Sequence, residues 1–125
     1  MLMRSPLARD RRRPPGFIPP CQPVLADRVP TGDGWIHELK HDRFRILVRK
    51  EGSDVRLWSR NGRDWSAEFC AIVAWLRELP GSFVIDGEAV AHCAEGLPDF
   101  HRLLGGDGQR SACLYVFDLL HERRG

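Results

Sequence analysis

FRILVRKEGSDVRLWS, residues 44–59, is the stretch that decides the fold. Apolar side chains occupy every second position at its start, at Phe44, Ile46 and Val48. The positions around and between them are mostly arginine, so the segment is expected to be a half-buried strand with one apolar and one largely basic face. Residues 51–54 then form a turn signal, and residues 55–59 form a second strand-like run. A β-hairpin is therefore predicted here.

The segments that follow extend this hairpin into a larger sheet. Residues 67–79 place apolar side chains at helical spacing, with Ser66 as the expected N-cap and Pro80-Gly81 as the stop. The expected fold class is α+β, with a mainly antiparallel sheet and few helices. The remaining predicted elements are a turn at 60–62, strand pieces at 83–86 and 88–91 on either side of Gly87, a short helix at 100–104, and an apolar run at 113–117 typical of a central strand.

The composition is that of a soluble globular domain. The chain has 125 residues, 42% hydrophobic and 29% charged, which suits one domain with a core and argues against a disordered or membrane protein. No stretch approaches the ~20 consecutive apolar residues that a membrane helix needs. The four cysteines show no C-x-x-C pairing, which argues against a disulfide scaffold and a zinc ribbon. We therefore expect a cytoplasmic protein without a membrane partner.

The first 34 residues or so form a proline-rich lead-in to the domain. Within it, residues 1–16 are expected to be a flexible basic arm, and residues 17–125 the domain itself. Such an arm suits sequence-independent contact with nucleic-acid phosphates, although a charged terminus flanked by proline is more often a solvated tail. The arm is opposed only by Asp10 and carries Arg4, Arg9, Arg11, Arg12 and Arg13.

Residues 35–45, WIHELKHDRFR, admit two incompatible interpretations. HELKH at 37–41 matches the zinc-protease pattern H-E-x-x-H, in which two imidazoles one helical turn apart bind the metal. That hypothesis needs a helix, whereas the aromatic and β-branched neighbours favour a strand. In a strand His37 and His41 would lie ~13 Å apart, too far to share an ion bound at ~2 Å. The zinc protease is therefore the weaker interpretation, and two surface histidines are the simpler explanation.

The second interpretation places a lysine between two acids, in the order Glu38-x-Lys40-x-Asp42-x-x-Arg45. Further motifs follow along the chain: Ser59-Arg60-Asn61-Gly62, then Asp86-Gly87-Glu88, then Tyr115-Val116-Phe117-Asp118-Leu119. Each one alone is an ordinary turn or core segment. In this order they resemble the motifs of ATP-dependent DNA ligases, most closely the bacterial ligases associated with end joining, over residues 17–125. The resemblance implies an ATP-grasp-like nucleotidyltransferase domain, also called an adenylation domain, of which this chain is the N-terminal part.

The resemblance implies that Lys40 attacks ATP to form a covalent lysyl-AMP, that AMP then passes to a DNA 5′-phosphate, and that the nick is sealed. A lysine with its ordinary pKa near 10.4 is almost wholly protonated at neutral pH, so about 4 kcal/mol opposes the attack. Nearby acids favour the ammonium form further. Mg²⁺ arriving with ATP is the expected source of compensating positive charge.

The resemblance also implies a set of roles and partners. The expected partners are nicked or broken DNA and a separate C-terminal ligase half, in the nucleoid-associated cytoplasm of a bacterium. The implied roles are Lys40 as nucleophile, Glu38 at the adenine amino group, Arg45 and Arg60 at sugar and phosphates, Glu88 at the ribose and metal, Phe117 stacked on adenine, and Asp42, Asp86 and Asp118 as supporting residues.

The sequence departs from the family pattern in two places. Arg43 stands where the family has glycine, and the chain ends at Gly125, before the family's later metal motif, paired-lysine motif and barrel domain. We therefore expect a truncated ligase domain. The alternative of a different class is a non-catalytic remnant that binds nucleotide or DNA, with the arginine arm making the DNA contact.

Overall fold

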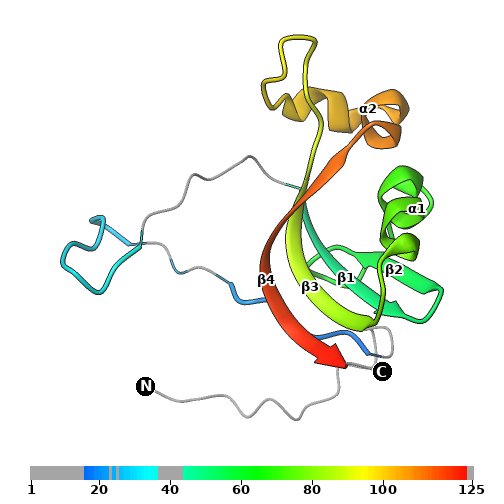
Figure 1. Ribbon diagram of the computed structural model, residues 1–125. Coiled ribbons are helices and arrows are strands. Elements are labelled where there is room, and N and C mark those ends of the chain that lie inside the picture. The colour runs from blue at the N-terminus through cyan, green and yellow to red at the C-terminus, as the bar shows by residue number, and fades with distance from the viewer. Residues whose placement is uncertain (1–15, 23, 25, 37–43, 124–125) are drawn as a thin grey trace.

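The strands of the structure form one antiparallel sheet, with the spatial order β2-β1-β3-β4 (Figure 1). The structure is a computed structural model and describes residues 16–22, 24, 26–36 and 44–123. The predicted α+β class is confirmed. The elements are β1 (Arg45–Glu51), β2 (Asp54–Trp58), α1 (Cys70–Glu78), β3 (Ser82–Val90), the 3₁₀-helix η1 (Phe100–Leu104), α2 (Gly106–Arg110) and β4 (Cys113–Arg123).

The predicted hairpin is formed by β1 and β2. Val48 pairs with Leu57 and Glu51 pairs with Asp54, so the register places the turn where the sequence signals it. Gly52 in that turn has φ of +58°, a left-handed conformation that costs glycine little and other residues more. The turn chemistry therefore fixes which side chains of β1 face the core.

The main core lies on the face of the sheet that α1 covers (Figure 1). Alternate residues of the strands point to this face, as the two-residue period of a strand requires. The helix contributes Ile72, Val73 and Leu76, which are all buried. The fully buried members of this core are Ile46, Val48, Leu57, Phe69, Leu76, Ala89 and Ala91, each with no exposed area.

The opposite face of the sheet is less basic than the sequence predicts. Leu47, Trp58 and Val84 form a second buried cluster there, and Phe17 of the lead-in packs against it. The ring of Phe17 lies edge-on to Trp58 with 5.8 Å between centroids. Because the lead-in crosses this face, the arginines of β1 are half-buried rather than solvated.

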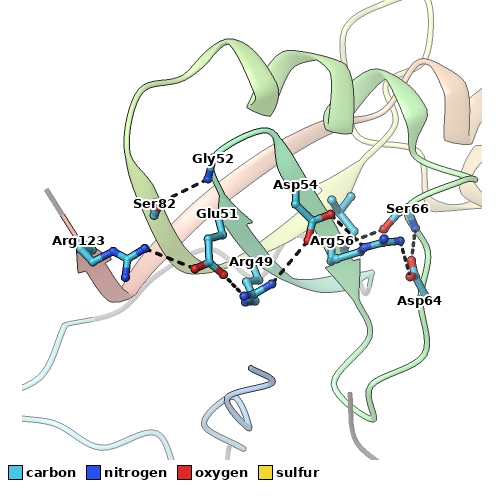
Figure 2. A network of polar contacts seen from close by, with 10 residues as sticks. Arg49, Glu51, Gly52, Asp54, Arg56, Asp64, Ser66, Ser82 and Arg123 are labelled. Carbon is cyan, nitrogen blue, oxygen red and sulfur yellow. Dashed lines mark hydrogen bonds and ion pairs between the residues drawn. The ribbon is translucent and has the colours of Figure 1, made fainter. Parts of the chain in front are cut away.

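The polar residues at the hairpin end are joined by ion pairs (Figure 2). Glu51 accepts from Arg49 on its own strand and pairs with Arg123 at the end of β4, with 3.4 Å between nitrogen and oxygen. Arg56 pairs with Asp54 at 3.3 Å and with Asp64 at 3.7 Å. These exposed pairs each contribute little stability, but together they connect three strands.

Three local predictions are wrong. The helix begins at Cys70 rather than near residue 67, and Ser66 does not cap it, because the Ser66 hydroxyl accepts the Leu57 backbone N–H at 2.9 Å instead. β3 runs through Gly87 without a break, because the glycine permits close approach of the neighbouring strand. β4 is an edge strand of the described sheet, not a central one, and the short helix α2 has no periodic signal in the sequence.

In the part of the chain that the structure describes, no helix is long and apolar enough to cross a membrane.

Candidate functional site

An arginine–aspartate pair lies at the centre of the sheet face opposite α1. Arg45 is the first residue of β1, and Asp86 lies on the adjacent β3. The guanidinium donates to both carboxylate oxygens, from Nε at 3.0 Å and from Nη2 at 2.6 Å. Asp86 is 1% exposed, so its charge is compensated by this pair and not by water. The two-point contact fixes the plane of the guanidinium.

Two further contacts hold Arg45. Its Nη1 donates to the backbone carbonyl of Cys21 at 2.5 Å, which ties the lead-in to the site. The guanidinium also lies over the ring of Phe117, with 5.7 Å from its central carbon to the ring centroid. The pKa of Arg45 is raised, first by the hydrogen bond to Asp86, and burial opposes this shift. Arg45 therefore stays cationic, held between an aspartate, a carbonyl and an aromatic ring.

Glu88 lies next to this pair in a row that crosses the sheet. Arg45 on β1 is its partner on one side and Tyr115 on β4 is its partner on the other. Residues directly opposite each other in antiparallel strands have side chains on the same face, about 5 Å apart at Cβ. The strand register alone therefore brings a cation, a carboxylate and a phenol together on the face that carries Phe117.

A bulge in β4 places Phe117 and Asp118 on this face together. Asp86 pairs with Asp118 and Gly87 pairs with Val116, so Phe117 is the extra residue between them. The aspartates face each other across the strands, and such like charges repel. Arg45 relieves the repulsion by neutralising Asp86.

Gly87 is required by the close approach of β4. A Cβ added there would lie 2.6 Å from the carbonyl oxygen of Tyr115 and 3.2 Å from Leu114. Only glycine allows the Asp86-Gly87-Glu88 motif to pair with the bulged strand. The glycine of this motif is thus explained by the closeness of the β3 and β4 backbones. The acids on either side of the glycine face the site.

Two groups that lie at or beside this site were not predicted from the sequence. The Cys21 carbonyl is a backbone group and leaves no signal in the side-chain pattern. His92 follows β3, and its Nε2 lies 2.6 Å from the hydroxyl of Tyr115. The signal that could have found it is the spacing Asp86, Glu88, His92, since these positions share one face of an extended chain.

The structure brings together some of the predicted site residues and not others. Arg45, Asp86 and Phe117 are in contact, and Glu88 and Asp118 lie beside them in register. Arg60 is exposed in the turn after β2, at the end of the sheet where β1 begins. The remaining predictions lie outside the described residues: Glu38, Lys40, Asp42, Arg43 and the histidine pair at 37 and 41.

The described residues include no group of three or more His, Cys, Asp or Glu side chains that could hold a metal ion. This arrangement does not support a metal held by described protein side chains alone. It is compatible with Mg²⁺ bound through phosphates and one or two carboxylates, which is the usual manner for this ion.

Comparison with known proteins identifies the family to which the chain belongs. The family model described as "ATP dependent DNA ligase domain" matches residues 23–124. The multifunctional non-homologous end joining protein LigD of Pseudomonas aeruginosa is 36% identical over 92% of this chain, which spans 15% of that protein. DNA ligase C1 of Mycolicibacterium smegmatis is 46% identical over 58% of this chain, which spans 22% of that protein.

Solved structures give the same result. The crystal structure of the ligase domain from M. tuberculosis LigD matches with a TM-score of 0.57 and 35% identity, over 68% of this chain and 29% of that one. A mycobacterial DNA ligase D complexed with ATP and MES matches with the same TM-score and identity. The chain thus spans less than a third of each of these relatives and structures. It belongs to the ATP-dependent DNA ligase domain family.

Proposed function

We propose that this chain provides the nucleotide-binding face of an ATP-dependent DNA ligase that acts in end joining. The observation that carries the proposal is the Arg45–Asp86 pair, held beside Phe117 and Glu88 on one face of the sheet. The residues of the family motifs that lie far apart in the sequence meet there. The names of the relatives, which include end-joining proteins and DNA ligases, support the same activity.

The chemistry of this face suits ATP. Phe117 is 52% exposed, so one part of its ring is available for stacking on adenine, which contributes ~1–3 kcal/mol per base in other proteins. The Arg45 side chain, although paired with Asp86, is 23% exposed and is the proposed contact to sugar or phosphate oxygens. Arg60 is exposed at the same end of the sheet. Glu38 is the proposed contact to the adenine amino group, and Asp42, Asp86 and Asp118 are the proposed supporting residues.

The proposed reaction begins at Lys40. Its neutral Nζ forms a bond to the α-phosphorus of ATP, the bond from that phosphorus to the bridging oxygen breaks, and pyrophosphate leaves with the electron pair. The proton lost from nitrogen passes to solvent. The AMP is then transferred to a DNA 5′-phosphate, and the neighbouring 3′-hydroxyl displaces AMP to close the strand. Mg²⁺ bound with the nucleotide beside Glu88 would neutralise phosphate charge during these steps.

Two proposed partners follow from the same activity. Broken or nicked DNA is the substrate, and the basic segment 1–16 is a candidate contact to its phosphates. The domain proper is proposed to begin at residue 17. The relatives are several times longer than this chain, so further ligase segments, on the same or another polypeptide, are proposed to complete DNA engagement.

The experiment that tests the proposal is intact-protein mass spectrometry after incubation with ATP and Mg²⁺, with NAD as a control nucleotide. The chain contains only two lysines, Lys40 and Lys50. Lys50 is 4% exposed and donates to the carbonyls of Gly52 and Gly81, so it is a poor nucleophile. We expect one AMP adduct with ATP and none with NAD. Peptide fragmentation should locate the adduct at Lys40.

The matched variant is Lys40→Arg, which keeps the positive charge but removes the amine nucleophile. It should form no adduct. Absence of an adduct on the folded wild-type chain would contradict the catalytic proposal for this chain and favour a non-catalytic domain that binds nucleotide or DNA.

A further inference from the structure

A second polar site lies at the hairpin end of the sheet, on the face that carries Arg45. A cavity of about 390 Å³ lies there between the lead-in and the strands, with Gly16 and Ile18 among its lining residues. Arg49 also lines it and lies four residues after Arg45 on β1, on the same face and roughly 13 Å along the strand. The cavity is therefore distinct from the proposed nucleotide residues.

The strand register gathers basic side chains at this cavity. Arg49 pairs with Val84, and Val84 pairs with His121, so the two basic side chains lie on one face of the sheet. Ser82 and Arg123 form the last pair of β3 and β4, on the same face. All five of these residues line the cavity.

The cavity lining has an excess of positive charge. Its described lining residues include three cations and one acid, namely Arg49, Lys50, Arg123 and Glu51. Both arginines share the single carboxylate (Figure 2). Lys50 is 4% exposed and donates to two backbone carbonyls, which are neutral and do not cancel its charge. Arg49 also faces Asp54 at 3.7 Å, outside the lining. The lining therefore favours an anion.

The donors at this cavity can reach a further acceptor. The Arg123 side chain is 67% exposed and approaches Glu51 with Nη2 at 3.4 Å. A guanidinium has several N–H donors, so this contact leaves others for a second acceptor, and an exposed ion pair costs little to rearrange. The Ser82 hydroxyl oxygen accepts the Gly52 N–H at 3.4 Å, which leaves the hydroxyl proton to donate. The oxygens of a phosphate group accept from both kinds of donor.

The lead-in forms one wall of the cavity directly against Arg49. A Cβ added at Gly16 would lie 2.7 Å from Arg49 Nε, so the lead-in backbone lies on this arginine. In the sequence, two prolines separate Gly16 from a segment with four arginines in residues 9–13. A polyanion with repeated phosphates is the ligand whose charge suits both the cavity and this segment.

We propose that this cavity binds a phosphate group of the DNA backbone, with Arg49 and Arg123 as the main contacts and Ser82 as a further donor. The inference rests on the proposed function for its partner, DNA. It goes beyond that function because it locates a DNA contact among the strands, at the end of the sheet away from Arg45. Free phosphate presents the same oxygens, so the experiments must separate the two sources.

The main test is binding of a fluorescein-labelled nicked DNA duplex to the full 125-residue chain, measured by anisotropy at several salt concentrations. Arg123→Gln should weaken binding about twofold to fivefold and reduce the slope of log affinity against log salt by about one. Arg123→Lys keeps the charge and should retain the slope. The matched control is Arg110→Gln, which removes one charge from an exposed ion pair on α2, at the other end of β4 (Figure 1).

Glu51→Gln should have the opposite effect. It removes the carboxylate that competes with phosphate for both arginines, so DNA binding should tighten about twofold to fivefold. Asp107→Asn removes the same charge beside Arg110 and should change the affinity less. If the network only stabilised the strands, Glu51→Gln would weaken binding or leave it unchanged, and that result would overturn the proposal. If Arg123→Gln does not fold by circular dichroism, the comparison of Glu51→Gln with Asp107→Asn decides.

Inorganic phosphate identifies the source of the bound group. When it is titrated into the ¹⁵N-labelled chain, the amide signals of Gly52 and Ser82 should shift, because they border the cavity. Such shifts together with the expected changes in DNA affinity would support the proposal. The same shifts with unchanged DNA affinity in every cavity variant would assign the cavity to free phosphate and overturn the DNA contact.

The outcomes also separate this inference from the proposed function. Arg123→Gln should form the AMP adduct as the wild type does, since the cavity lies away from Arg45. Adduct formation with DNA affinities that no cavity variant changes would overturn this inference and leave the ligase proposal standing. Altered DNA affinity in a chain that forms no adduct would support the cavity and contradict catalysis. Absence of DNA binding by the wild type would overturn the inference.

Discussion

At the scale of single residues, the site depends on a glycine as much as on its charged groups. Gly87 separates the two acids of the site and lies against β4 at a distance that excludes a side chain. Its backbone position sets where Tyr115 and Phe117 stand relative to Glu88. A change at this position therefore acts on stability and on the site together.

Gly87→Ala should lower the free energy of unfolding by about 1–3 kcal/mol, because the new methyl group forces β4 away from β3. Urea denaturation followed by circular dichroism measures this change. Gly34→Ala is the matched control, since a Cβ there meets nothing within 4 Å, and we expect a change within about 0.5 kcal/mol. Equal effects of the two substitutions would contradict the close approach of the strands.

Several site residues could be predicted from the sequence because the motifs identify them by type and order. Arg45, Asp86 and Phe117 meet in the structure as those motifs imply. The Cys21 carbonyl could not be predicted, because any residue offers the same backbone oxygen. The roles of Lys40, Glu38 and Asp42 stay predictions, since these residues lie outside the described part of the chain.

At the scale of elements, the strands were easier to predict than the helix boundaries. The alternation in β1 and the Gly52 turn signal are local, so the sequence is sufficient for the hairpin. The start of α1 depends on a tertiary contact instead. Ser66 satisfies the amide of Leu57 on β2, and that competing partner removes it from the helix end. The edge position of β4 likewise depends on the pairing of distant strands.

Ser66→Ala should cost about 1–3 kcal/mol, because it leaves the Leu57 N–H without its partner beside a fully buried side chain. Hydrogen exchange locates the effect, and the Leu57 amide should exchange faster than in the wild type. Ser53→Ala in the exposed hairpin turn is the control and should change stability little. Faster exchange confined to the first turn of α1 would instead support a capping role.

At the scale of the whole molecule, β4 leaves apolar side chains at the edge of the core. Val116 and Leu119 face the same side as the core, because they pair with Gly87 and Ile85, and they are 48% and 54% exposed. Trp75 of α1 is 58% exposed nearby and lines an apolar cavity of about 320 Å³ with Leu114. Apolar strand edges of this kind favour association.

We expect the 125-residue chain to self-associate at high concentration, as light scattering coupled to size exclusion would show by masses above 14.3 kDa. Leu119→Lys should shift the mass toward the monomer, because a charge on the edge opposes pairing. Val29→Lys adds the same charge at a position that is 71% exposed and lies outside the strands, and should have little effect. Monomeric behaviour of the wild type at all concentrations would contradict this expectation.

The contact between Tyr115 and His92 has a spectroscopic consequence, because Tyr115 is the only tyrosine in the chain. Ring-labelled tyrosine would give a single set of NMR signals, assigned without mutagenesis and located beside Glu88. Its chemical shifts would test whether ATP binds at this face, as proposed above. The sequence thus provides this face of the sheet with a native probe that needs no engineered label.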